Sequence, residues 1–237
     1  MGLRSWLHDR LLPAARRRGL ARNPATMEAG LARCAARAPG IRTVIDVGAS
    51  DGRWSRAARP ILPAANYFMV EARKEHEPGL ARTAADPAFS YQICAAGDRD
   101  GEIYFDASEL FGGQASETPY EKNGIVVPVR RLDGLAVERA LQGPFALKLD
   151  THGYEVPIFE GARALLKRSA LLIVECYNFR LTAQSLLAHE MCAYLAGHGF
   201  RCIDLCDPLY RPRDGALWQM DLFFAPASDA VFESNVY

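Results

Sequence analysis

The sequence lacks several features that would each point to one class of protein. It has no excess of either charge, because 28 Lys and Arg residues balance 28 Asp and Glu residues. It has no apolar run of about 18 residues, so no transmembrane helix is predicted. Its N-terminus has no continuous apolar stretch before a small-residue cleavage site, so no secretory signal peptide is predicted. We therefore expect a cytoplasmic protein with no general attraction to nucleic acid.

Cysteine pairs of the kind that bind zinc are missing as well. None of the six cysteines forms a C-x-x-C pair, and no His or Cys pair lies near Cys202 and Cys206 to complete a site. We therefore expect reduced thiols that are buried in the interior. The six residues are Cys34, Cys94, Cys176, Cys192, Cys202 and Cys206.

The fingerprints of nucleotide-binding proteins are incomplete. The stretch TVIDVGASDG, residues 43–52, is typical of an apolar strand that ends in a glycine-rich turn. A G-x-G-x-x-G turn for a pyrophosphate would need glycines where Ser50 and Arg53 stand, and Asp51 would repel phosphate. The chain also lacks a P-loop and the Y-x-x-x-K pair of short-chain dehydrogenases. A nicotinamide or nucleoside triphosphate ligand is therefore disfavoured.

What the sequence does contain is an alternation of strand and helix patterns over 237 residues, enough for one α/β domain with a hydrophobic core. Strands are expected at 43–47, 66–72, 89–96, 145–150, 170–177, 200–206 and 217–226. Helices are expected at 26–37, from 52 onward, and at 80–85, 156–168 and 181–199. Such alternation predicts a mainly parallel sheet with helices on both faces.

An acidic residue follows nearly every expected core strand. Parallel sheets bind ligands at the carboxyl ends of their strands, so these acids are expected to meet at one site. For any single acid the alternative is capping of the next helix, which explains all five together less well. The acids are Asp46, Glu71, Asp98, Asp150 and Glu175.

A ligand that contains adenosine but no phosphate suits this pattern. S-adenosylmethionine carries a sulfonium, an ammonium group and a ribose diol. Acids near the turn would bind the ammonium, and Glu71 would accept hydrogen bonds from both ribose hydroxyls. Asp98 would lie near the adenine amino group.

At these residues the sequence resembles the FkbM family of S-adenosylmethionine-dependent methyltransferases. The resemblance covers roughly residues 27–226 and rests on VIDVGASDGRWS, YFMVEA, CAAGDRDG, VPVRRLDGL, LKLDTHGYEVPIFEGA and LLIVECY. It extends into HEMCAYLAGHGFRCIDL and LWQMDLFF, and the block from Lys148 to Ala162 is its most specific part. The resemblance implies a Class I (Rossmann-like) methyltransferase fold with seven strands, and O-methylation of sugar or natural-product hydroxyls.

The resemblance also implies a set of cofactor-binding residues, with S-adenosylhomocysteine as the product. By position these are Asp46, Gly48, Ser50 and Gly52 in the turn, with Glu71 on the ribose. The full set of expected cofactor-binding residues also contains Ala49, Asp51, Ala72, Ala95, Asp98 and Asp150. Two positions differ from common members, which often have Asn in place of Ser50 and Gln or Glu in place of His152.

The catalytic candidates are Asp150, His152 and Glu175. A hydroxyl nucleophile needs a base or a metal to take or weaken its proton, and a histidine has a suitable pKa. The alternatives are a His152 that bonds to backbone, an Asp150 that caps a helix, and a metal site formed by all three. Lys148 is expected either to pair with an acid or to touch substrate.

The acceptor is expected to be a small molecule or a glycan. Tyr154, Tyr210 and Arg211 are the candidates for its binding, and a lid-like insertion near 101–131 with Gly112 and Gly113 would cover it. A surface excursion between two strands is the alternative for that insertion.

We divide the chain into an N-terminal helical cap, 1–40, and a methyltransferase domain, 41–237. The cap carries a net charge of +6 from eight arginines, Asp9 and Glu28, which indicates either a solvated face or peripheral contact with an acidic surface. The alternative function for the whole chain is a catalytically inactive adenosine-binding or scaffold domain.

Overall fold

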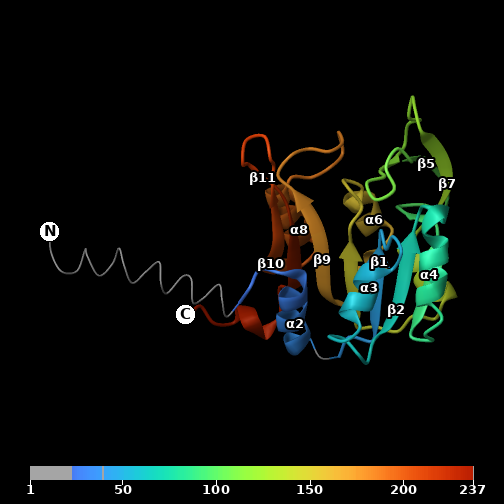
Figure 1. Cartoon of the computed structure of the whole chain (residues 1–237). Coiled ribbons are helices and arrows are strands. Elements are labelled where there is room, and N and C mark those ends of the chain that lie inside the picture. The colour runs from blue at the N-terminus through green and yellow to red at the C-terminus, as the bar shows by residue number, and fades with distance from the viewer. Residues whose placement is uncertain (1–22, 39, 237) are drawn as a thin grey trace.

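The computed structural model describes residues 23–38 and 40–236, which form a central sheet with helices on both faces (Figure 1). The basic segment before residue 23 lies outside the described residues. The strands of the central sheet are β1 (Thr43–Val47), β2 (Asn66–Glu71), β3 (Phe89–Ile93), β8 (Phe145–Leu149), β9 (Ser169–Tyr177), β10 (Phe200–Tyr210) and β11 (Leu217–Pro226).

The seven strands follow the order β10-β11-β9-β8-β1-β2-β3. The five strands from β9 to β3 run parallel, and β11 pairs antiparallel with both β9 and β10. The fold is therefore the Rossmann-like Class I methyltransferase fold, as predicted, including the antiparallel strand near one edge.

Two hydrophobic clusters fill the two faces of this sheet. One face is covered by α2 (Met27–Arg37), α3 (Arg53–Ala58) and α4 (Glu77–Thr83), whose apolar residues pack on the sheet. The other is covered by α5 (Leu132–Glu138), α6 (Glu155–Glu160), α7 (Arg163–Leu166) and α8 (Ala188–Gly197). Two 3-10 turns, η1 (Lys74–His76) and η2 (Ala230–Phe232), complete the described elements.

The predicted third strand, 89–96, is in fact two strands in two sheets. After β3 the Cys94 amide still donates a hydrogen bond to the Glu71 carbonyl at 2.9 Å, and then the chain leaves the central sheet. A four-stranded sheet follows, in the order β4-β7-β5-β6. It consists of β4 (Ala95–Ala96), β5 (Gly101–Asp106), β6 (Ala115–Ser116) and β7 (Gly124–Arg130).

The expected helix at 181–199 is shorter, because α8 begins at Ala188. Ser185 Oγ accepts hydrogen bonds from the amides of Leu181 and Thr182, at 3.0 and 3.1 Å, and Thr182 Oγ1 accepts from the Ser185 amide. These side chains satisfy the backbone locally and so compete with helix formation before Ala188.

The expectation of buried thiols is correct for four of the six cysteines. Cys192 is half-buried and Cys202 is exposed, and all six are free. Among the described residues, the helices are all too short or too polar to cross a membrane.

The parallel register brings the ends of several strands together at one edge. Asp46 of β1 lies beside Lys148 of β8, and both belong to the face that packs against α2 and α3. Glu71 ends β2 two residues beyond Met69, which is the residue paired with Asp46. Four of the five acids that the sequence places after separate strands therefore gather around the ends of β1, β2, β8 and β9, whereas Asp98 follows β4 of the small sheet and is exposed.

The close approach between α6 and the start of the small sheet generates a stability prediction. A Cβ on Gly161 would lie 1.9 Å from the Gly97 carbonyl oxygen, so we expect Gly161→Ala to lower the free energy of unfolding by roughly 1–3 kcal/mol. Gly134 in α5 has open space around it, and Gly134→Ala is expected to be neutral or to add up to about 1 kcal/mol. Urea unfolding checks both variants; equal stabilities would contradict the packing argument.

Candidate active site

The glycine turn after β1 packs tightly against the ends of β2 and β8. The amides of Gly48 and Ala49 both donate to the Val70 carbonyl, at 3.0 and 3.1 Å. Gly48 has φ of +76°, and a Cβ there would lie 2.1 Å from the Asp150 carbonyl oxygen. Position 48 therefore requires glycine, because any side chain would clash with the backbone at Asp150. The next two residues, Ala49 and Ser50, line the cavity described below.

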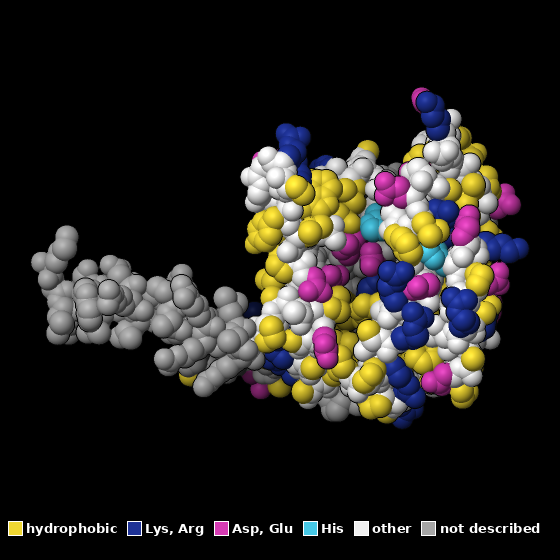
Figure 2. Space-filling view, in the orientation of Figure 1, with side chains coloured by type: hydrophobic (Ala, Val, Ile, Leu, Met, Phe, Trp, Pro, Cys, Tyr) yellow, Lys and Arg dark blue, Asp and Glu magenta, His cyan; other side chains and the backbone are white. Residues whose placement is uncertain are grey.

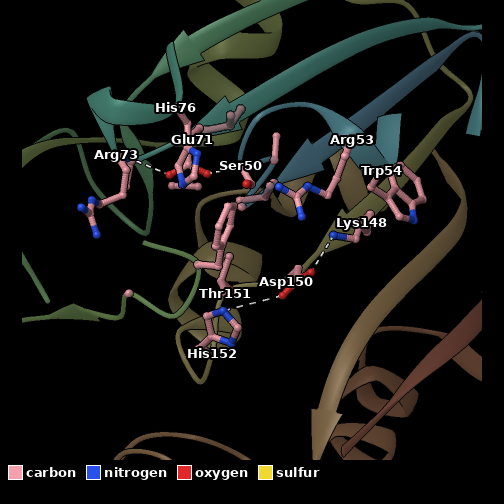
Figure 3. A pocket seen from close by; sticks show the side chains of 18 of the residues that line it. Ser50, Arg53, Trp54, Glu71, Arg73, His76, Lys148, Asp150, Thr151 and His152 are labelled. Atoms are coloured by element: carbon pink, nitrogen blue, oxygen red, sulfur yellow. Dashed lines mark hydrogen bonds and ion pairs between the residues drawn. The ribbon is translucent and has the colours of Figure 1, made fainter. Parts of the chain in front are cut away.

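Glu71 ties this turn to the end of β2. Its Oε2 accepts a hydrogen bond from the Ser50 amide and its Oε1 from the Arg73 amide, each at 2.7 Å (Figure 3). The side chain is 6% exposed, and burial raises its pKa despite these two bonds. Each oxygen keeps a further lone pair, so the carboxylate is a rigid acceptor at the cavity wall.

A buried cation links the ends of β1 and β8. Lys148 Nζ lies 3.0 Å from Asp150 Oδ2 and 3.6 Å from Asp46 Oδ1. Burial opposes the charge of Lys148, but the carboxylates of Asp150 and Asp46 raise its pKa above its ordinary value. Asp46 is fully buried and also accepts a hydrogen bond from Ser55 Oγ at 2.7 Å. Of the two interpretations of Lys148, the ion pair is therefore correct.

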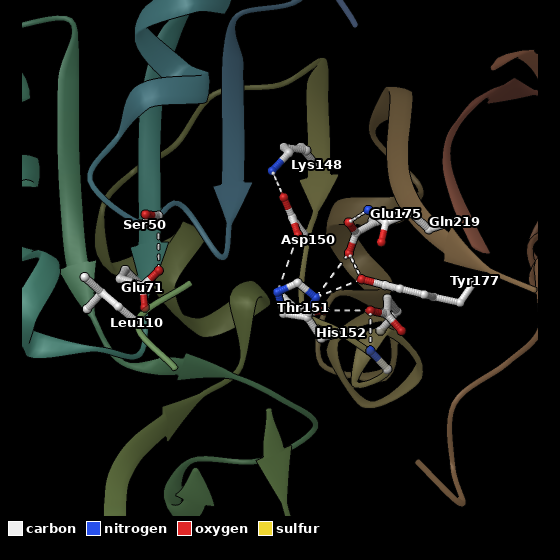
Figure 4. Close-up of polar contacts among 12 residues, drawn as sticks. Ser50, Glu71, Leu110, Lys148, Asp150, Thr151, His152, Glu175, Tyr177 and Gln219 are labelled. Atoms are coloured by element: carbon white, nitrogen blue, oxygen red, sulfur yellow. Dashed lines mark hydrogen bonds and ion pairs between the residues drawn. The ribbon is translucent and has the colours of Figure 1, made fainter. Parts of the chain in front are cut away.

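His152 lies between two carboxylates (Figure 4). Its Nδ1 is 2.9 Å from the Tyr177 hydroxyl and 3.2 Å from Glu175 Oε2, and its Nε2 is 3.9 Å from Asp150 Oδ1. The residue has φ of +52°, a left-handed conformation that non-glycine residues rarely adopt. Such strain, which aims the imidazole at the rim, is typical of functional sites.

Glu175 is itself oriented by two donors. The Tyr177 hydroxyl donates to Glu175 Oε2 and the Gln219 amide donates to Oε1, each at 2.5 Å. Because the Tyr177 hydroxyl gives its proton to Glu175, its oxygen accepts one from His152 Nδ1, which leaves Nε2 for the cavity side.

The carboxylates make this imidazole unusually basic. Burial alone would lower the pKa of His152, but the hydrogen bond to Glu175 and the charges of Glu175 and Asp150 raise it to about 9. For Asp150, burial would raise the pKa, and the charges of Lys148 and His152 bring it below its ordinary value.

The same three residues have the donor set of a metal site. One ligand atom from each of Asp150, His152 and Glu175 lies within 4.8 Å of the others. Two carboxylates and an imidazole would suit a divalent transition metal. A second group with this spacing is formed by Cys206, Asp207 and Asp221.

A single cavity of about 840 Å³ joins these features. Eight of the thirteen predicted cofactor and catalytic residues line it, together with Tyr154. Those that line it are Gly48, Ala49, Ser50, Glu71, Ala72, Ala95, Asp150, His152 and Tyr154. Glu175 contacts the cavity indirectly, through His152.

Other predicted residues are engaged elsewhere. Asp46 lies beneath the wall with Ser55 and Lys148, and Asp51 pairs with Arg53 at 2.9 Å. Gly52 packs near Met69 and Thr83, and Asp98 is exposed beside Arg99. Tyr210 is 56% exposed on β10, and Arg211 pairs with Asp214 and lies 4.0 Å above the Phe179 ring.

The segment between β5 and β6 covers one side of the cavity. Arg73 Nη1 donates to the Glu109 carbonyl at 2.8 Å, and His76 Nε2 lies 2.9 Å from the Leu110 carbonyl. The Arg53 guanidinium lies 4.6 Å from the centre of the Phe111 ring, and Leu110 and Phe111 line the cavity. The structure thus puts this part of the predicted insertion at the cavity; its movement as a lid stays a prediction.

Several site residues were not anticipated from the sequence: Tyr177, Gln219, Arg73, His76 and Trp54. Tyr177 could have been found, because it lies two residues after Glu175 and so shares its strand face. Gln219 comes from the antiparallel partner, where it is paired with Tyr177, and that register was not visible in the sequence.

Comparison with known proteins identifies the family. The model of the methyltransferase FkbM domain matches residues 46–202. This match confirms the resemblance seen in the sequence. No curated protein matches the chain.

Solved structures share the fold at low sequence identity. The methyltransferase FkbM of Methylobacillus flagellatus KT is 16% identical, with a TM-score of 0.50; the match covers 77% of this chain and 43% of that protein. A putative RNA methyltransferase of Pyrococcus horikoshii is 13% identical, with a TM-score of 0.48, over 84% of this chain and 83% of its own. The 1,6-didemethyltoxoflavin-N1-methyltransferase of Burkholderia thailandensis is 16% identical, with a TM-score of 0.45, over 93% and 86%. These likenesses concern the fold alone.

The buried ion pairs of Lys148 generate a prediction for stability. Lys148→Met leaves Asp46 without its cation in the interior, so we expect a loss of roughly 3–5 kcal/mol in the free energy of unfolding. Adding Asp46→Asn removes the stranded charge and should recover part of that loss, whereas the exposed control Lys167→Met should change little. Urea unfolding of Lys148→Met, Asp46→Asn, the double variant and Lys167→Met checks this; strictly additive losses would contradict the coupling between Asp46 and Lys148.

Proposed function

Since this chain belongs to the FkbM methyltransferase family, we propose that it transfers a methyl group from S-adenosylmethionine to a hydroxyl group of a sugar, a glycan or a secondary metabolite. One observation carries the proposal: the Glu71 carboxylate and the His152 imidazole line the same cavity. The first is an acceptor for a diol, and the second is a base for an alcohol. The balanced charge of the chain favours a small-molecule or glycan acceptor over nucleic acid.

The wall around the glycine turn fits the cofactor. Glu71 would accept hydrogen bonds from the ribose hydroxyls through the lone pairs that the Ser50 and Arg73 amides leave free. The buried Ser50 Oγ lacks a hydrogen-bond partner among the described residues, and Ser50 lines the cavity, so a polar ligand atom would satisfy it. When bound, the sulfonium would make the methyl carbon electrophilic.

His152 is the proposed general base. With Nδ1–H directed to Tyr177 and Glu175, the Nε2 lone pair of the neutral ring takes the proton of the acceptor hydroxyl as the oxygen attacks the methyl carbon. The carbon–sulfur bond breaks and the new carbon–oxygen bond forms, which yields a methyl ether and S-adenosylhomocysteine. Glu175 stabilises the resulting imidazolium, and Asp150 adds a second carboxylate beside it.

Two alternatives to this proposal can be tested: a metal-assisted reaction and a domain that binds the cofactor without catalysis. The spacing of Asp150, His152 and Glu175 also favours a divalent cation, which would lower the pKa of a bound hydroxyl in place of a base. A scaffold that binds the cofactor without turnover is the remaining alternative; release of S-adenosylhomocysteine in a panel of hydroxylated compounds separates it from an enzyme.

The ribose assignment is tested at Glu71. We expect Glu71→Ala to weaken S-adenosylmethionine binding by at least about tenfold, roughly 1.4 kcal/mol, because the diol loses its acceptor and the Ser50 amide its anchor. Glu71→Gln, which keeps one acceptor oxygen, should fall between this variant and the natural protein. Isothermal titration calorimetry measures both affinities.

The control for this test is Glu75→Ala, four residues further on, whose side chain is 54% exposed. Its affinity should equal that of the natural protein. An unchanged affinity in Glu71→Ala would remove Glu71 from the ribose site. No measurable binding to the natural protein at millimolar cofactor would reject the proposed function itself.

The role of His152 is tested by rate and by pH. We expect His152→Ala to lower turnover roughly a hundredfold or more while cofactor affinity changes little. Because the pKa of His152 is raised to about 9, the base form accumulates only as pH rises toward that value. kcat/KM should therefore increase with pH and level off above about 9, and Glu175→Gln should move this midpoint to lower pH.

Two results would contradict the base assignment. One is a pH profile that does not move in Glu175→Gln. The other is loss of activity on chelation that divalent cations restore, which would assign the three residues to a metal instead.

A further inference from the structure

The cavity extends well beyond the turn and His152, into a lobe between two helices. Figure 2 shows the molecule hollowed in the region that lies between α2 and α3 in Figure 1. Lys148 of β8 also borders the cavity here. We call it the α2–α3 lobe and define it by six apolar lining residues, Met27, Leu31, Trp54, Ala57, Ala58 and Ile61; Glu28 of α2 also lines the cavity here.

The lobe exists because α2 and α3 are attached to different parts of the sheet. Arg33 of α2 pairs with Asp204 of β10 at 2.7 Å, and the Met27 amide donates to Asp207 at 3.0 Å. Gly30 lets α2 approach β11, because a Cβ there would lie 2.9 Å from the Phe223 ring. These contacts hold α2 over β10 and β11, while α3 follows directly from the turn after β1.

The lining of this lobe suits hydrocarbon. The six residues that define it are apolar, Glu28 is exposed to solvent, and the nearby cation of Lys148 is already paired with Asp46 and Asp150. The Lys148 Nζ also lies 5.3 Å from the centre of the Trp54 ring, which gives the lobe an aromatic wall. The ammonium and carboxylate of the cofactor would gain nothing from the six apolar side chains, so the cofactor does not account for them.

The size of the cavity agrees with a second ligand. Pockets for drug-sized ligands measure roughly 300–1,000 Å³. At about 840 Å³ this cavity lies near the upper end of that range, and its lining includes Glu71, His152 and Ile61. A molecule in the lobe would therefore reach the rim where the proposed methyl transfer takes place.

We propose that the acceptor is amphipathic: its hydroxyl-bearing end lies at His152, and an apolar chain of the same molecule occupies the α2–α3 lobe. This inference rests on the proposed function for its hydroxyl end. Burial of the apolar part of the acceptor strengthens its binding. Each methylene group that enters the lobe contributes about 0.8 kcal/mol, which is roughly a fourfold gain in affinity.

The experiment compares alkyl β-D-glucosides that differ in chain length alone, from methyl to octyl. Their binding to the full chain saturated with S-adenosylhomocysteine is measured by calorimetry and by the fluorescence of Trp54, with Trp54→Phe to assign the signal. We expect affinity to rise with each added methylene by up to about fourfold, and then to level off when the lobe is full.

A filled lobe provides the matched variant. Ala57→Trp places an indole in the lobe and should abolish the gain from longer chains, while binding of S-adenosylhomocysteine stays unchanged. Ala32→Trp, on an exposed position of α2 that does not line the cavity, should behave like the natural protein.

The outcomes separate this inference from the function on which it rests. If S-adenosylhomocysteine does not bind, the proposed function fails. If it binds but octyl glucoside binds no more tightly than methyl glucoside, or if Ala57→Trp leaves the gain intact, the α2–α3 lobe is not the site of an acceptor chain.

Discussion

The ion pairs of Lys148 are the constraint on which the rest of the site depends. A fully buried carboxylate at the end of β1 would be costly without a partner, and Lys148 supplies that partner from the adjacent position of β8. The same ammonium holds Asp150, the first residue after β8, at 3.0 Å. The glycine turn follows β1 and the strained loop with His152 follows β8. Lys148 therefore fixes the starting points of both relative to each other.

The acids at the strand ends have different roles because each meets a different neighbour. Asp46 pairs with the Lys148 ammonium inside the sheet. Glu71 accepts hydrogen bonds from two backbone amides at the cavity wall, and Glu175 contacts the imidazole of His152. Acids with similar positions at strand ends thus have structural, binding and electrostatic roles. What distinguishes them is the neighbour that each side chain meets: an ammonium, two peptide N–H groups, or a histidine.

The sequence predicted the sheet and the identity of most residues at its edge, because strand periodicity and the acids that follow each strand are local signals. It could not predict that Asp46 turns inward while Asp150 faces the rim, since that depends on the register of β1 against β8. Gln219 reaches Glu175 because of an antiparallel pairing across the sheet. The α2–α3 lobe depends on where α2 is attached, through Arg33 and Asp204, 171 residues apart.

The way in which the segment after β5 is held over the cavity has a consequence for variation. Arg73 and His76 hold it by the backbone carbonyls of Glu109 and Leu110, and neither contact uses a side chain of that segment. Leu110 can therefore be exchanged without loosening these two hydrogen bonds, whereas the Phe111 ring also contacts Arg53 and His76. The cavity wall can therefore be redesigned at Leu110 while the two hydrogen bonds that hold the segment stay in place.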